Sequence, residues 1–176
     1  MTDKTNFPDC PHINKCETWD EAAALALEII EDLAFHQIRW NPSSVEKSLA
    51  TIDTQLDVAL NSHEQQQPRR SERALEIVAA TAYNTLLNQH QSTQTVFDTC
   101  LQLLVDRHHK YGAGNINRAK HVGLIIRMGD KHARLQNNAG DFEDETMIDA
   151  WYDLVGYGTI SVMLANNWFN LPLTTR

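Results

Sequence analysis

Three acidic residues at helical spacing, Glu145, Asp149 and Asp153, are the side chains of this sequence best arranged to do chemistry. Residues four apart on a helix lie on one face, with roughly 5–6 Å between their Cβ atoms. A buried carboxylate without a partner takes up a proton, so neighbouring carboxylates stay charged only where cations neutralise them. Either basic side chains or a metal ion must therefore lie opposite these acids.

The preceding segment supplies both kinds of group. Arg127, Asp130, Lys131 and Arg134 recur at spacings of three and four, so they share a helix face. The short connection to the acids predicts an antiparallel helical hairpin, which would bring the two faces together. An oxygen-only ligand set on facing helices suits Mg²⁺ or Mn²⁺, and such ions commonly bridge phosphate oxygens. Spacing alone is equally compatible with an Arg/Lys–Asp network that only orients the two helices.

A glycine-bearing segment, YGAGN at 111–115, lies between two predicted helices. Its glycines permit positive φ and close approach of a ligand. Lys110 and Tyr111 add a cation and a flat ring, and Asn115 adds a donor and an acceptor. By itself the segment is typical of a glycine that ends a helix before a turn. Beside an acid cluster and a basic face, it indicates a nucleotide pocket.

Three blocks occur in order: KYGxxNI from Lys110, RMxDKxxRL from Arg127, and ExxxDxxxDLxGY from Glu145. Together they resemble the nucleotide-modification-associated family of phage and bacterial proteins. That family is similar to the MazG-like and dimeric-dUTPase group of all-α nucleoside triphosphate pyrophosphatases. The resemblance covers about residues 100–172. It implies a metal-dependent (deoxy)nucleoside triphosphate pyrophosphohydrolase, in which water attacks the α-phosphate and releases a monophosphate and pyrophosphate.

The resemblance also implies roles for individual residues. Mg²⁺ or Mn²⁺ would be the cofactor, a purine nucleotide such as dGTP or GTP the substrate, and a dimer or tetramer the assembly. The metal ligands would be Asp130, Glu145, Asp149 and Asp153; the catalytic residues Glu145 as general base, Asp149 and Lys131; the substrate contacts Lys110, Tyr111, Asn115, Arg127 and Arg134.

The sequence departs from the MazG pattern of Glu-x-x-Glu followed by Glu-x-x-Asp. Arg127-x-x-Asp130 stands at the first pair and Glu145-x-x-x-Asp149 at the second, so the metal count and the general base stay open. The alternative is a non-catalytic helical protein that binds a nucleotide or a partner, with Arg127 and Arg134 neutralising the acids.

Two further groups compete for a metal. Glu28, Glu31 and Asp32 with Asp53 and Asp57 are closer to the MazG spacing, but a solvated acidic face is the favoured interpretation. Cys10, His12 and Cys16 could hold zinc, but an ordinary N-terminal loop is favoured, because no fourth ligand is evident. We expect Cys100, Trp151 and Trp168 in the core, and His108 and His109 beside the cleft or in solvent.

Helical periodicity without strand-type alternation predicts an all-α bundle of about six helices, in one domain spanning 1–176. Residues 1–70 would form an arm and a helical hairpin, and 71–176 the nucleotide-binding core. The formal charge of −8 argues against nucleic-acid binding. No apolar run reaches the roughly 20 residues of a membrane span, and the N-terminus lacks a signal-peptide core. We expect a cytoplasmic protein, of the host cell if phage-encoded. The expected helices span about 18–39, 45–60, 72–89, 93–110, 122–137 and 143–166.

Overall fold

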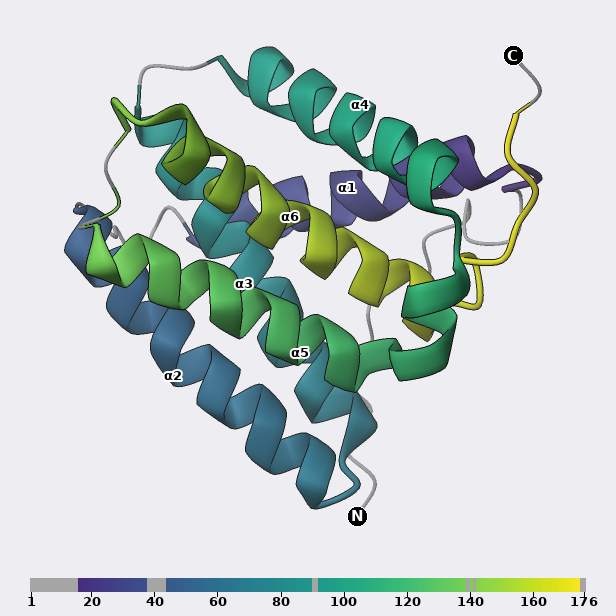
Figure 1. Ribbon diagram of the computed structural model, residues 1–176, viewed down its shortest axis with the longest axis horizontal. Helices are drawn as coiled ribbons and strands as arrows, with labels where there is room; N and C mark the ends of the chain where they lie inside the picture. The colour runs from purple at the N-terminus through teal and green to yellow at the C-terminus, as the bar shows by residue number, and fades with distance from the viewer. Residues whose placement is uncertain (1–15, 38–43, 90–91, 139, 141, 175–176) are drawn as a thin grey trace.

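The computed structural model describes residues 16–37, 44–89, 92–138, 140 and 142–174, and these contain six helices and no strand. The predicted all-α bundle is confirmed (Figure 1). The helices are α1 Trp19–Gln37, α2 Val45–Glu64, α3 Pro68–Asn88, α4 Thr93–Tyr111, α5 Gly114–Asn137 and α6 Glu145–Ala165.

Capping residues set several of the helix starts. The Thr18 hydroxyl accepts from the Glu21 backbone N–H at 3.4 Å, while the Glu21 carboxylate accepts from the Thr18 N–H at 3.3 Å. This is a reciprocal capping box. Ser44 caps α2 by accepting from the Lys47 N–H at 3.3 Å. Such caps satisfy N–H groups that have no partner inside the helix.

Two boundaries differ from the prediction. The connection between the helices expected at 45–60 and 72–89 is much shorter, because α2 runs to Glu64 and Pro68 opens α3, where its fixed φ fits the first helical turn. The expected glycine loop before residue 122 is also short. Gly112, with φ +61°, ends α4, and α5 begins at Gly114. Helical geometry in α5 is interrupted only at Lys120, with φ 46° and ψ −139°.

The centre of the bundle is the contact between α3 and α6. α6 is buried on nearly all sides, and Trp151, which was expected in the core, is wholly enclosed. Gly158 allows the close approach, because a Cβ there would overlap that of Ala79 on α3. The predicted core positions Cys100 and Trp168 are buried as well.

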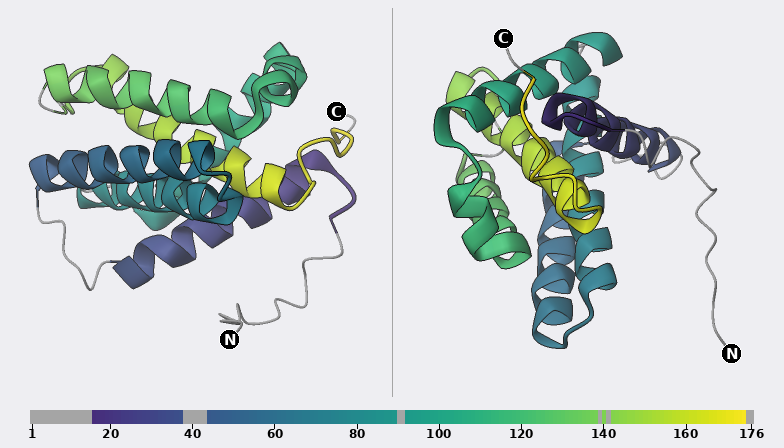
Figure 2. Two further views of the ribbon diagram at one scale, coloured as in Figure 1. Left: turned by 90° about the horizontal axis from the view of Figure 1, so that it is seen from below. Right: turned by 90° about the vertical axis from the view of Figure 1, so that its right-hand side faces the viewer.

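The remaining helices pack around this pair. α1 contacts α3 and α6, α2 contacts α3 and α5, and α4 lies along the side of α1 and α6 (Figures 1 and 2). α5 and α6 run antiparallel side by side, as expected from their short connection (Figure 1). Within the described ranges, no helix combines the length and the hydropathy that a membrane crossing requires.

Candidate functional site

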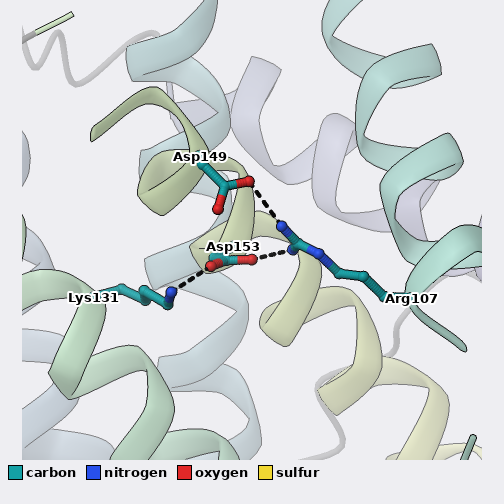
Figure 3. Close-up of polar contacts among 4 residues, drawn as sticks. All are labelled: Arg107, Lys131, Asp149 and Asp153. Atoms are coloured by element: carbon teal, nitrogen blue, oxygen red, sulfur yellow. Dashed lines mark hydrogen bonds and ion pairs between the residues drawn. The ribbon is translucent and has the colours of Figure 1, made fainter. Parts of the chain in front are cut away.

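Arg107, Lys131, Asp149 and Asp153 form a chain of ion pairs between α4, α5 and α6 (Figure 3). Arg107 donates from Nη2 to Asp149 Oδ1 at 2.8 Å and from Nη1 to Asp153 Oδ1. Lys131 Nζ lies 2.7 Å from Asp153 Oδ2. Both carboxylate oxygens of Asp153 therefore face a cation, and one guanidinium bridges two acids that lie one turn apart.

The four side chains of this ion-pair cluster are buried to different extents. The Asp153 side chain is 6% exposed and Lys131 is 21% exposed, whereas Arg107 and Asp149 are 36% and 49% exposed. Ion pairs strengthen as water is excluded, so the contacts of Asp153 are the strong ones and the Arg107–Asp149 contact is screened. The cluster thus has a fixed, enclosed end at Asp153 and a wet end at Asp149.

The sequence predicted that cations must neutralise these acids, but it did not identify Arg107 as the principal cation. Arg107 belongs to α4, whose buried Cys100 and Leu104 lie on the face that Arg107 extends at helical spacing. The sequence pattern that could have indicated this site is a charged residue, Arg107, at the end of a row of apolar residues on one helix face. It does not say which helix this row packs on, so the contact with α6 was not deducible.

The predicted basic residues of α5 separate into three situations. Lys131 does contact Asp153. Arg127 is exposed and lines the cleft described below. Arg134 is exposed near the start of α6. Hydrogen bonds from Thr146 lower the pKa of Asp144, and the charge of Arg134 makes a smaller contribution in the same direction. Only Lys131 and Arg127 are thus at the acid pair or its cleft.

A cleft of about 440 Å³ opens beside Asp153, between the end of α4, the start of α5 and the middle of α6. Of the predicted substrate contacts, Tyr111, Asn115 and Arg127 line it. Lys110 is exposed and does not line it; its ammonium lies 5.2 Å from the centre of the Tyr111 ring. The other lining residues are Trp19, Leu104, Arg107, His108, Gly112, Ile116, Asp153, Gly156, Tyr157, Ile160 and Phe169.

Three aromatic rings from distant parts of the chain form one wall of the cleft. The His108 ring stacks on Trp19 with centroids 4.2 Å apart and planes 6° apart. Phe169 meets His108 edge-on at 5.5 Å. Burial lowers the pKa of His108 from its ordinary value, the charge of His109 acts in the same direction, and Asp20 opposes both. Apolar walls with a few polar groups are typical of small-molecule sites.

The predicted metal ligands are dispersed in this arrangement. Asp130 and Glu145 are exposed, and Asp153 has both oxygens paired with cations. No group of three or more His, Cys, Asp or Glu side chains in the described part of the chain is close enough to hold a metal. In this arrangement the acids do not fit a bound Mg²⁺ or Mn²⁺. That the activity depends on a divalent ion stays a prediction.

The competing acidic group is also dispersed. Glu31 accepts a hydrogen bond from the Tyr83 hydroxyl at 2.7 Å, and Asp53 lies 3.7 Å from His132 on α5. Glu28, Asp32 and Asp57 are exposed, and none of these residues is in a potential metal-binding group. Of the possible zinc ligands, Cys10 and His12 lie outside the described residues. Cys16 is partly buried, and burial raises the pKa of its thiol.

Comparisons of the chain with protein-family models, with curated proteins and with solved structures found no match.

Proposed function

We propose that the cleft beside Asp153 binds a nucleotide. The observation that carries this proposal is the meeting of two arginines, Arg107 and Arg127, with an aromatic wall in one opening of about 440 Å³. Guanidinium groups form charge-assisted hydrogen bonds with phosphate oxygens, and aromatic rings accommodate a flat base. A cleft of this size is within the range of sites that enclose small ligands.

The two arginines would contribute differently. Arg107 is fixed by Asp149 and Asp153, so it offers a preorganised guanidinium with N–H donors beyond the two used by the acids. Arg127 has no ion pair among the described side chains and is exposed, so it is available to a phosphate at no cost in existing contacts. Lys131 acts indirectly by holding Asp153 against Arg107.

The activity that we propose for the site is hydrolysis of a (deoxy)nucleoside triphosphate to its monophosphate and pyrophosphate. It is supported by the three sequence blocks that resemble the nucleotide-modification-associated family of phage and bacterial proteins. All three blocks contribute residues to the cleft wall. The block from Lys110 contributes Tyr111, Gly112, Asn115 and Ile116, the block from Arg127 contributes Arg127 itself, and the block from Glu145 contributes Asp153, Gly156 and Tyr157. Divalent-ion dependence and a purine preference belong to the same proposal.

A second candidate, nucleotide binding without turnover, is favoured by a separate observation. Arg107 and Lys131 already neutralise the acid pair, so the charges that prompted a metal site are balanced by the protein itself. The two candidates share the cleft and differ in whether bound nucleotide is consumed.

Binding and turnover can be measured separately. We expect Arg127→Ala to weaken triphosphate binding about tenfold, the loss of one charge-assisted hydrogen bond. Arg134→Ala is the matched control, because Arg134 is also exposed on α5 but does not line the cleft. Calorimetric titration with each common NTP and dNTP, in EDTA and in Mg²⁺ or Mn²⁺, measures the affinity. Equal affinities of the two variants, or no nucleotide binding at all, would contradict the proposed site.

Pyrophosphate release in the same mixtures decides between the candidates. Release that is lost in Asp149→Asn supports the hydrolase, since Asp149 is the more exposed of the paired acids and its removal leaves both contacts of Asp153 in place. Binding of a nucleotide with no pyrophosphate from any of them supports the second candidate.

A further inference from the structure

The His108 ring is held in a fixed orientation at the cleft wall. Trp19 covers one ring face at a centroid separation of 4.2 Å, and Phe169 packs edge-on at 5.5 Å. Trp19 and Phe169 are themselves buried and meet at 6.3 Å, so the three rings brace one another. A ligand in the cleft therefore meets an imidazole whose direction is set before binding.

The protonation of His108 suits recognition of an uncharged edge. Burial and the neighbouring His109 lower the pKa of His108, with Asp20 opposing both, and a lowered pKa favours the neutral imidazole. A neutral imidazole has one N–H donor and one acceptor nitrogen. Neither nitrogen has a hydrogen-bond partner among the described residues, although the ring is partly buried and lines the cleft.

Unpaired polar groups at the wall of a cleft make a selective site. A ligand that supplies a matching donor or acceptor gains a hydrogen bond, and one that does not leaves a partly desolvated nitrogen unpaired. The neighbouring residue on α4 is Arg107, which lines the same cleft at its charged side. If the phosphates of a nucleotide bind Arg107 and Arg127, its base would contact the uncharged aromatic wall.

From this arrangement we infer that His108 determines base specificity, by hydrogen bonding to the edge of the nucleotide base. The inference rests on the proposed nucleotide site and adds the residue that distinguishes one base from another. Trp19 and Phe169 are positioning residues in this scheme, because they orient His108 and need not touch the base.

The test compares His108→Phe with His109→Phe. The phenylalanine at 108 keeps an aromatic ring against Trp19 but removes both nitrogens. The same substitution at 109 changes an exposed residue that does not line the cleft. Dissociation constants are measured for dATP, dGTP, dCTP and dTTP, and for inorganic triphosphate, which has phosphates and no base.

We expect the wild type and His109→Phe to prefer one base by about tenfold, the discrimination available from one hydrogen bond. In His108→Phe the four affinities should agree to within about threefold, while the affinity for inorganic triphosphate stays unchanged. An unaltered base ranking in His108→Phe, or a wild type that binds all four bases equally, overturns the inference. Failure of every nucleotide and of inorganic triphosphate to bind the wild type would instead refute the nucleotide site itself.

A direct readout covers the case in which His108→Phe does not fold. The imidazole ¹⁵N resonances of wild-type protein are followed during titration with the four nucleotides, and His108→Asn serves to assign them. A hydrogen bond to the base should move a His108 nitrogen resonance with the preferred nucleotide and leave it unmoved with inorganic triphosphate. No movement with any nucleotide that binds would overturn the inference.

Discussion

Replacing Asp153 with alanine in metal-free protein tests whether basic side chains are what stabilises the buried acid. The variant removes the acceptor for Arg107 Nη1 and the only ion-pair partner of Lys131 among the described residues. If the ion pairs stabilise the buried acid, the variant must have a lower free energy of unfolding than the wild type. If the carboxylates mainly repel each other and await a metal, removal of one should leave the apo protein as stable or make it more stable.

The contacts give the expected size of the effect. Hydrogen bonds to charged groups contribute about 1.5–3 kcal/mol each, and breaking a buried ion pair from one side costs about 3–5 kcal/mol. Arg107 keeps Asp149 and some water in the variant, whereas Lys131 is left largely enclosed without its partner. We therefore expect Asp153→Ala to lower the free energy of unfolding by about 3 kcal/mol. For a chain of this length, that corresponds to a fall in Tm of about 6–12 °C.

Asp149→Ala is the matched control, because it removes the same chemical group one turn away. Its pair with Arg107 is about half exposed, so the expected loss is about 0–1 kcal/mol. Both variants and the wild type are unfolded with urea in EDTA, with Asp153→Asn added to remove the charge while keeping the shape. Equal stability of Asp153→Ala and wild type, or a more stable variant, would refute the conclusion that these ion pairs hold the acid.

Two further predictions concern the helices that position the site. Gly158→Ala should destabilise the protein by about 1–3 kcal/mol, because the new Cβ would overlap that of Ala79. The control Gly129→Ala has open space around it and should be neutral or stabilising by up to about 1 kcal/mol. Thermal melts in which Gly129→Ala is the less stable of the two variants would contradict this packing. Hydrogen bonds from Thr146 lower the pKa of Asp144, so its contribution to stability is present above its unfolded pKa near 4 and is lost as pH falls through the lower folded value. The Tm advantage of wild type over Asp144→Asn should shrink between pH 5 and pH 3, and a constant difference would count against this contribution.

Local signals in the sequence predicted most of the fold. Helix starts at Ser44 and around Thr18 follow from capping side chains, which act within four residues and so are readable along the chain. The burial of α6 follows from its lack of a polar face. The third helix begins earlier than the expected residue 72, because Pro68 fits the first helical turn. The helix expected from about residue 122 corresponds to the part of α5 after the break at Lys120, and the helical stretch from Gly114 to that break was not predicted.

The site was harder to predict, because its residues come from separate parts of the chain. The sequence predicted that basic residues of α5 contact the acids, and Lys131 does contact Asp153. The cation that bridges the two acids, however, is Arg107 on α4. The aromatic wall joins Trp19 near one end of the chain to Phe169 near the other. Pairings across such separations depend on how helices pack, and periodicity along one helix carries no information about its neighbour.

The charge balance of the cleft bears on how a divalent ion could act. Arg107 and Lys131 pair with two carboxylates and Arg127 lines the same cleft, so these five groups together have a single net positive charge. A nucleoside triphosphate has several negative charges, and the surplus lies close to Asp149 and Asp153. Like charges at short range oppose binding unless a cation reduces them. A divalent ion associated with the phosphates would do so without any ligand from the paired acids, since Arg107 and Lys131 already satisfy the buried one. Metal dependence of nucleotide binding is therefore compatible with an acid pair held entirely by basic side chains.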